Sequence, residues 1–127
     1  MPELTLYEYA VVRAVPQVYR EEFVNVGVVL YCRKSKFAAM QFFIQEAKIR
    51  ALCPEIEISL LENHLLAFQR ICAGDKQGGP LAALDIAERF RWLTAKRSTI
   101  IQCSAVHPGL TADPQQTLAE LFNKLVL

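Results

Sequence analysis

The fold is decided by residues 24–32, which read Val24-Asn25-Val26-Gly27-Val28-Val29-Leu30-Tyr31-Cys32. Apolar residues occupy every second position from Val24 to Cys32, and this period of two places an unbroken apolar row on one face of a β-strand. A short polar loop at 34–36 follows, and apolar residues alternate again over 37–44. Two alternating runs joined by a short loop predict an antiparallel hairpin.

Two further strands flank this hairpin in the sequence. Residues 4–15 are rich in tyrosine and valine and end before Pro16, whose missing backbone N–H predicts the end of a first strand. Residues 98–106 contain several β-branched residues and predict a last strand. The dipeptide Pro108-Gly109 then predicts a turn.

Helices are predicted where apolar residues recur at spacings of three and four. The first begins near Ser59, which forms a capping-box pattern with Glu62, and ends at Gly74. The second begins at Pro80, and the third has Asp113 as its N-cap. Their predicted buried stripes are Leu61, Leu65, Phe68 and Cys72, then Ala83, Ile86, Phe90 and Leu93, and finally Leu118, Leu121, Phe122 and Leu125.

These elements predict an α+β domain over residues 1–127, in the order βββ-αα(α)-β-α, with a third central helix left open. We expect a small, mainly antiparallel sheet of about four strands with the helices packed on one face. Val29 and Tyr31 add apolar residues to the second face of the strand at 24–32. If that face is uncovered, a homodimer is the natural way to bury it.

Composition limits the function classes. Of 127 residues, 14 are basic and 13 acidic, and the net charge of +1 gives no general attraction to nucleic acid or to a membrane surface. The four cysteines are too dispersed for a zinc or redox motif, so we expect buried free thiols and no metal. The longest apolar run, 26–32, is far below the roughly 20 residues of a membrane helix. With no secretory pattern at the start, the expected compartment is the cytoplasm.

Short catalytic signatures are missing from the sequence. It contains no glycine-rich phosphate loop, no His-Glu-x-x-His helix and no nucleophile elbow. We therefore expect no cofactor, and an enzyme is the less favoured class. Three polar groups near strand ends remain as candidates.

The first candidate group enters the central strand. Arg20, Glu21 and Glu22 precede Asn25 and Gly27. In one interpretation, Gly27 lets a ligand approach while Asn25 and a carboxylate of Glu21 or Glu22 contact it. In the other, Gly27 marks a β-bulge and Asn25 bonds the neighbouring loop, which the frequency of glycine at bulges favours.

The second candidate group surrounds Trp92. Arg89, Arg91, Lys96 and Arg97 lie within nine positions and are followed by Ser98 and Thr99. Arg91 and Arg97 could hold an anion in bidentate contacts, and the hydroxyls of Ser98 and Thr99 could donate to it. The alternative is a solvated helix face on which the charges only confer solubility.

The third candidate group is the segment His107-Pro108-Gly109-Leu110-Thr111, which we expect to form a turn before the last helix. His107 is the best candidate for proton transfer, because imidazole changes charge near neutral pH. Thr111 is a ligand-binding candidate, since free backbone donors gather at a helix start. The alternative is a turn histidine bonded to a backbone carbonyl.

The same stretches carry a family resemblance. They are Tyr7-Glu8-Tyr9-Ala10-Val11-Val12-Arg13, then Arg20-Glu21-Glu22-Phe23-Val24-Asn25-Val26-Gly27-Val28-Val29-Leu30, and last Arg89-Phe90-Arg91-Trp92-Leu93 with Arg97-Ser98-Thr99 and His107-Pro108-Gly109-Leu110-Thr111. In this order they resemble the bacterial domain-of-unknown-function family 3037, with one departure at Lys96, where a small residue or proline is expected. The resemblance implies a bacterial protein with no assigned activity, encoded beside proteins similar to HipA-type kinases and acting with a partner.

Three function hypotheses follow. The leading one is a non-catalytic accessory or protein-interaction domain. The alternative is an anion-binding or phosphoryl-transfer enzyme that uses the Arg97 cluster with His107, and it requires the two residues to share a pocket. Nucleic-acid binding through the basic cluster and Trp92 comes third and is disfavoured by the near-neutral charge.

Overall fold

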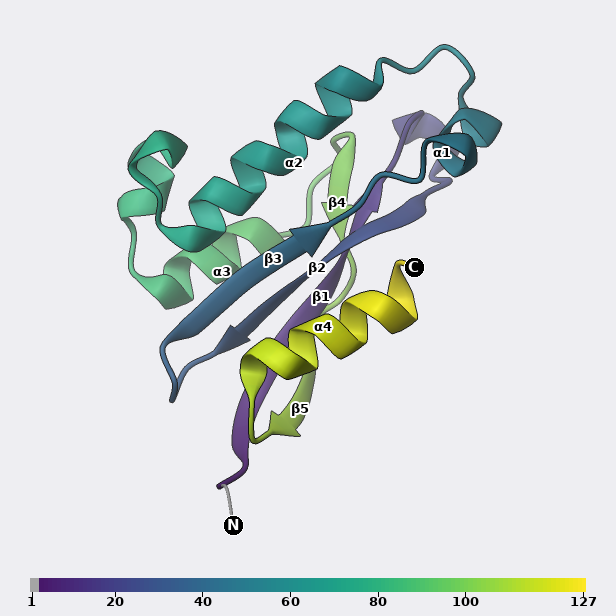
Figure 1. Cartoon of the computed structure of the whole chain (residues 1–127). Coiled ribbons are helices and arrows are strands. Elements are labelled where there is room, and N and C mark those ends of the chain that lie inside the picture. Colours follow the sequence, from purple (N-terminus) through teal and green to yellow (C-terminus); the bar gives the residue numbers. More distant parts are fainter. Residues whose placement is uncertain (1–2) are drawn as a thin grey trace.

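The computed structural model describes residues 3–127 and has a five-stranded sheet at its centre (Figure 1). The strands are β1 (Thr5–Ala14), β2 (Val24–Cys32), β3 (Phe37–Phe42), β4 (Ile101–Cys103) and β5 (His107–Thr111). The order is β3-β2-β1, and both β4 and β5 pair with the far side of β1. Every pairing is antiparallel, so the α+β class and the predicted hairpin are confirmed.

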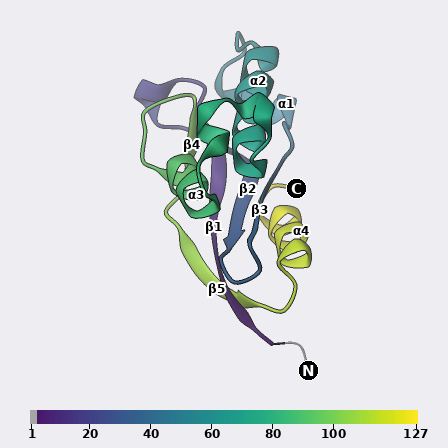
Figure 2. The ribbon, with the colours of Figure 1, turned by 90° about the vertical axis from the view of Figure 1, so that its left-hand side faces the viewer.

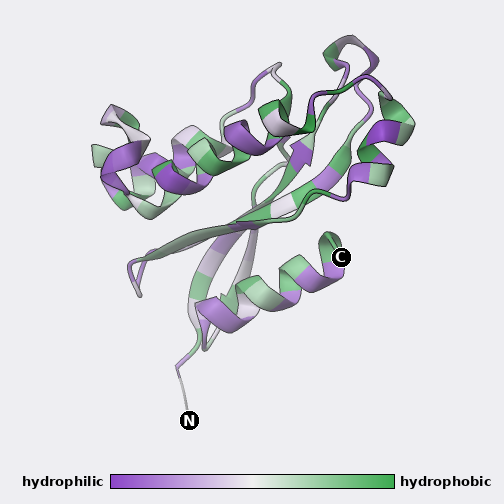
Figure 3. Cartoon of the chain, turned by 45° about the horizontal axis from the view of Figure 1, so that its top comes forward, coloured by the Kyte–Doolittle hydropathy of each residue, from purple (hydrophilic) through white to green (hydrophobic). Residues whose placement is uncertain are grey.

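Helices cover both faces of this sheet. α2 (Ile58–Ala73) and α3 (Ile86–Thr94) pack on one face, whereas α4 (Pro114–Leu125) packs on the other (Figure 2). α1 (Glu46–Leu52) joins β3 to α2 and supplies the third central helix. The expectation that all helices share one face is therefore wrong. Apolar and polar residues alternate around the helices, which gives each an inner and an outer side (Figure 3).

A β-bulge in β2 places Val24 and Val26 on the opposite face of the sheet from Val28, Leu30 and Cys32. Val12 pairs with Gly27 and Arg13 pairs with Asn25, so Val26 has no residue opposite it. One extra residue shifts the alternation of side chains to the opposite face. The apolar row expected on one face is thus divided between the two faces, and the bulge interpretation of Gly27 is confirmed.

The two faces of β2 belong to two different cores. The larger one lies under α2 and α3 and includes Val12, Val26, Val29, Tyr31, Ile49, Leu61, Leu65, Phe90 and Leu93. The smaller one lies under α4 and consists of Val28, Leu30, Cys32, Leu118 and Val126. Both faces of β2 are therefore buried by helices of the same chain.

Several predicted helix boundaries are confirmed and others are corrected. α2 ends at Gly74, whose φ of 71° is the left-handed conformation that glycine adopts readily. Its N-cap is Glu57 without a side-chain bond, so the capping box expected at Ser59 is wrong. Pro80 begins a 3₁₀ turn, η3 (Pro80–Ala83), and α3 starts only after Asp85.

The last predicted strand is also corrected. The strand predicted at 98–106 is shortened to β4, and the segment 107–111, where a turn was predicted, is a separate strand, β5. The cysteines are free thiols, of which Cys32 and Cys72 are buried and Cys53 and Cys103 are partly exposed. No helix among residues 3–127 is long and apolar enough to cross a membrane.

Asp113 caps α4 as the sequence predicts, because its Oδ1 accepts a hydrogen bond of 3.2 Å from the backbone N–H of Gln116. Asp113→Ala is expected to lower the free energy of unfolding by about 1 kcal/mol, the usual cost of losing an N-cap. Urea denaturation followed by circular dichroism measures the change. Asn123→Ala, on the exposed side of the same helix, is the control and should leave stability within about 0.5 kcal/mol of wild type.

Candidate functional site

Arg97 and His107 lie on opposite faces of the sheet. The Arg97 guanidinium stacks on Trp92 at 4.4 Å and on Phe68 at 5.4 Å, and both rings pack against the core under α2 and α3. The His107 ring lies 5.4 Å from the ring of Tyr9, which packs against the core under α4. An enzyme that uses these two residues in one pocket is therefore not compatible with the fold.

Arg97 has a local structural role at the end of α3. Its Nη1 donates to the carbonyl oxygen of Leu93 at 3.2 Å, and its Nη2 donates to that of Trp92. A basic side chain is a favourable cap at the end of a helix. The Trp92 carbonyl also accepts from the backbone N–H of Ala95 at 3.4 Å, and the Leu93 carbonyl accepts from Cys103 Sγ at 3.4 Å. The donors that were predicted to hold an anion are thus already engaged.

The rest of the predicted basic cluster is dispersed. Thr99 Oγ1 donates to the carbonyl oxygen of Ile101 at 2.8 Å, which shapes the entry into β4. Ser98 is exposed and lines a pocket beside β4, whereas Arg91 lines a different cavity beside β1. Closeness in sequence therefore does not produce one anion site from Arg91, Arg97, Ser98 and Thr99.

His107 and Thr111 are both in β5, at its two ends. His107 is exposed and pairs across the strands with Tyr9. Thr111 is buried, and its Oγ1 bonds Thr117 Oγ1 and accepts from the backbone N–H of Asp113 at 2.9 Å. Thr111 thus stabilises the start of α4 and offers no free group to a ligand.

The first candidate group is also accounted for by local contacts. Arg20 Nε and Glu22 Oε1 form an exposed ion pair at 2.6 Å, and this hydrogen bond lowers the pKa of Glu22. Asn25 Nδ2 donates to the carbonyl oxygen of Leu125 at 3.2 Å, so it fastens the end of α4 and not the neighbouring loop. Glu21 follows η1 (Val18–Arg20) with a left-handed φ of 57° and lines the pocket beside β4.

A cavity lies between β1 and α3, at a site that the sequence analysis did not identify. This β1–α3 groove has a volume of about 740 Å³ and is lined by Leu6, Glu8, Tyr31, Arg33, Lys34, Ala87 and Arg91. Leu6 pairs across the strands with Leu110 of β5, and the two are 59% and 64% exposed. Leu4, just before β1, is 59% exposed as well. We call Leu4, Leu6 and Leu110 the leucine patch.

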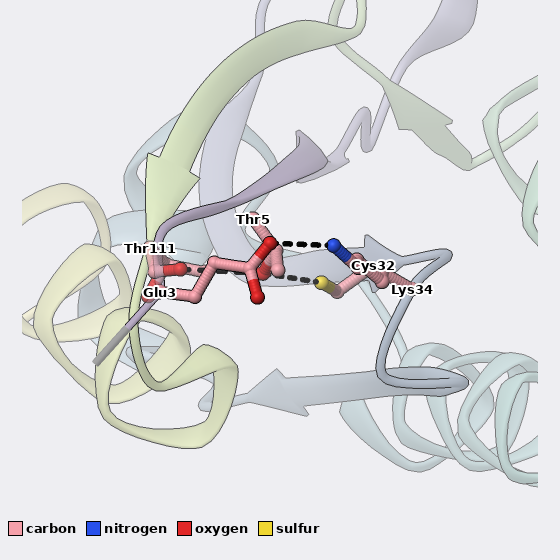
Figure 4. A network of polar contacts seen from close by, with 5 residues as sticks. All are labelled: Glu3, Thr5, Cys32, Lys34 and Thr111. Atoms are coloured by element: carbon pink, nitrogen blue, oxygen red, sulfur yellow. Dashed lines mark hydrogen bonds and ion pairs between the residues drawn. The ribbon is translucent and has the colours of Figure 1, made fainter. Parts of the chain in front are cut away.

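A network of polar contacts holds the strand that carries the patch (Figure 4). The Thr5 hydroxyl donates to the carbonyl oxygen of Thr111 at 3.2 Å and lies 3.4 Å from Cys32 Sγ. Lys34 Nζ forms an ion pair with Glu3 Oε1 at 2.6 Å. The start of β1 is therefore tied to both β2 and β5, so the exposed leucines stand on a fixed strand.

The Cys32 thiol takes part in the same network. Burial raises its pKa, but hydrogen bonds from the Ser35 and Thr5 hydroxyls and from the backbone at 34–35 outweigh burial, and the net shift is downward. The sulfur nevertheless has no exposed surface in the fold, because Cys32 is 0% exposed. Its observed contacts are structural.

Tyr7 fixes β5 from the opposite face. A Cβ added to Gly109 would lie 2.5 Å from the Tyr7 ring, so the ring can keep this position only because residue 109 is glycine. Two residues further along the strands, the Tyr9 ring lies 5.4 Å from the His107 ring. With its other face held by aromatic contacts, β5 presents Leu110 on the side of the groove.

The groove has an excess of positive charge. Arg33, Lys34 and Arg91 face one acidic lining residue, Glu8. Lys34 is paired with Glu3, whereas Arg33 and Arg91 form no ion pair with any other residue of 3–127. Two free guanidinium groups next to apolar side chains suit a ligand that is both apolar and acidic.

No three His, Cys, Asp or Glu side chains among residues 3–127 gather as a metal site would require. No curated protein and no solved structure shows significant similarity to the chain. A family model does match, over residues 9–126, and its description is a protein of unknown function, DUF3037. Because this match covers nearly the whole chain, the chain belongs to the DUF3037 family.

Proposed function

We propose that this chain is a non-catalytic interaction domain that binds an acidic, partly apolar segment of another protein in the β1–α3 groove. The observation that carries the proposal is the leucine patch beside two unpaired arginines. Single exposed leucines are common on soluble proteins, but contiguous ones beside a cavity are typical of binding surfaces.

The apolar contacts would supply most of the affinity. Leu6 and Leu110 form a cross-strand pair that is more than half exposed. Burying one leucine side chain is worth about 1.5–3 kcal/mol. A partner that covers the pair therefore gains a few kcal/mol of binding free energy, to which the charged contacts of the groove would add.

The charged rim favours an acidic partner. Arg33 and Arg91 both line the groove, and they come from different elements, Arg33 from the residue after β2 and Arg91 from α3. Carboxylates of a partner segment can pair with both, which would set its orientation and speed its association. The complex should weaken as salt concentration rises.

Addition of a partner strand to β5 is less favoured than binding in the groove. β5 is an edge strand, but it has only five residues and contains Pro108. Short edges with proline are a common protection against strand pairing. Side-chain contacts in the groove are therefore the proposed mode of recognition.

A kinase similar to the HipA type is the first partner to test. The choice of a kinase comes from the family resemblance. The groove itself indicates only the chemistry of the segment that binds, which is acidic and partly apolar. Within such a partner, the segment to test first combines leucine-like residues with aspartate or glutamate.

The test measures the dissociation constant of the candidate partner by titration calorimetry with wild type and three variants. Leu6→Asp and Leu110→Asp should each weaken binding about tenfold or more, because each loses about 1.5–3 kcal/mol of burial and adds a repulsive charge to an acidic partner. His107→Ala, on the other face, should bind as wild type does. Thermal melting checks that the variants are folded.

Two results would contradict the proposal. Wild-type affinity in folded Leu6→Asp and Leu110→Asp would place the interface elsewhere. If wild type instead self-associates in analytical ultracentrifugation and Leu110→Asp is a monomer, the patch binds a second copy and not an acidic partner.

A further inference from the structure

A second cavity lies beside β4 and shares no residue with the β1–α3 groove. It has a volume of about 480 Å³ and lies between the turn at 18–21 and the loop from α3 to β4, two segments that approach each other in Figure 2. Its charged lining residues are Arg13, Lys96, Arg97 and Glu21. We call it the Arg13 pocket.

Arg13 is a partly buried cation that has no ion-pair partner among residues 3–127. Its guanidinium makes no ion pair or hydrogen bond with another residue of 3–127, and its Nε is buried without a partner. The contact it does make is with the ring of Phe23, 4.1 Å from the guanidinium carbon. An unpaired cation out of water is unfavourable, and an anion beside it removes that penalty.

Other residues of the pocket add to the positive field. Lys96 is exposed and unpaired within 3–127, and Ser98 has a hydroxyl with no bond to another side chain or carbonyl there. Arg97 uses its donors on the end of α3 but keeps its charge. The nearest thiol is not a counter-ion, because burial raises the pKa of Cys103 to about 11 although Arg97 and Arg13 oppose the shift.

We propose that the Arg13 pocket binds a small organic oxyanion, a phosphate or carboxylate compound, with Arg13 and Lys96 as charged contacts and Ser98 as a hydroxyl donor. The planar fork of arginine fits both groups, and the pocket volume lies in the range of about 300–1,000 Å³ typical of small-molecule sites. Glu21 on the wall disfavours an extended polyanion such as a nucleic acid, which needs a continuous basic path.

The experiment titrates the full chain with inorganic phosphate and, separately, with citrate at low ionic strength, followed by amide chemical shifts in NMR. One of the two probes should bind with shifts confined to the pocket, and comparing them separates phosphate from carboxylate preference. Lys96→Ala should weaken binding about tenfold, the worth of one charge-assisted hydrogen bond. Glu21→Gln should strengthen it about threefold or more by removing the repulsive carboxylate.

Lys124→Ala is the matched control, because Lys124 is an exposed lysine on α4 outside the pocket and should leave affinity unchanged. Arg13→Gln should abolish anion binding. If Arg13→Gln does not fold, the loss of affinity in Lys96→Ala still tests the proposal. The proposal is overturned if neither probe binds at millimolar concentration, or if Lys124→Ala weakens binding as much as Lys96→Ala. Tighter binding of a single-stranded oligonucleotide, lost in Lys96→Ala, would replace it with a nucleic-acid site. Leu6→Asp should leave the affinity of the Arg13 pocket for its anion unchanged. The proposal for the Arg13 pocket and the proposal for the β1–α3 groove are therefore tested independently.

Discussion

Leu118→Ala is expected to lower the free energy of unfolding by about 2–5 kcal/mol, as truncation of a fully buried leucine usually does. Leu118 is 0% exposed and inserts from α4 between Val28, Leu30 and Cys32. The lost methyl groups would leave a cavity in the smaller core, which has few other residues to close it. Urea denaturation followed by circular dichroism measures the loss.

Leu110→Ala is the matched control for this experiment, since it removes the same atoms from a residue that is 64% exposed. It should change stability by no more than about 0.5 kcal/mol. Equal effects of the two substitutions would mean that α4 does not cover the second face of the sheet. The pair also separates stability from binding, because Leu110 is the residue expected to matter for the partner.

Because helices cover both faces of the sheet, no bare sheet face is left for a homodimer to bury. The sequence predicted a homodimer if the face that carries Val29 and Tyr31 is not covered by helices. In the structure they are 1% and 6% exposed and lie in the larger core. The leucine patch, at the end of the sheet, is an exposed apolar surface that suits a partner segment more than a broad dimer interface.

The alternation of apolar residues in the sequence predicted the strands, but it did not predict on which face of the sheet each apolar residue lies. The bulge is the reason for this difference. Residues 26–30 read Val26-Gly27-Val28-Val29-Leu30, so both faces of β2 are apolar there. A shift of one residue in such a run leaves the pattern of apolar residues unchanged. The pairing of Val12 with Gly27 and of Arg13 with Asn25 shows the shift, and only the neighbouring strand reveals it.

The candidate residues show a similar limit. Arg97 looked free in the sequence, but two backbone carbonyls at the end of α3 take its donors. Pro108 and Gly109 looked like a turn, but an edge strand tolerates the proline, and the Tyr7 ring occupies the space above the glycine. Since the turn pattern concealed β5, Leu110 was not recognised as the partner of Leu6. The alternation of Leu4 and Leu6 with Thr5 and Tyr7 was the one available signal for an exposed apolar row.

Gly27→Ala is expected to destabilise the protein by about 1–3 kcal/mol, the usual cost of forcing extra volume into a packed interior. A Cβ at this position would lie 2.6 Å from the carbonyl oxygen of Gln41 and 3.1 Å from the Cβ of Phe42. The oxygen belongs to the backbone of β3, so it cannot move aside as a flexible side chain can. Either the β2–β3 pairing opens or the bulge shifts.

Gly79→Ala is a suitable comparison, because nothing lies within 4 Å of its Cβ and only its backbone conformation, φ 76° and ψ −158°, opposes a side chain. Its cost should be about 1–3 kcal/mol, the conformational penalty alone, because this region is essentially restricted to glycine. Gly27→Ala should differ from it by shifting the amide signals of β2 and β3 in NMR spectra. Stability within about 0.5 kcal/mol of wild type in Gly27→Ala would contradict the close approach.

Because the bulge turns Val28, Leu30 and Cys32 toward α4, Gly27→Ala should also loosen α4, and faster hydrogen exchange in that helix would link the glycine to the two-sided fold.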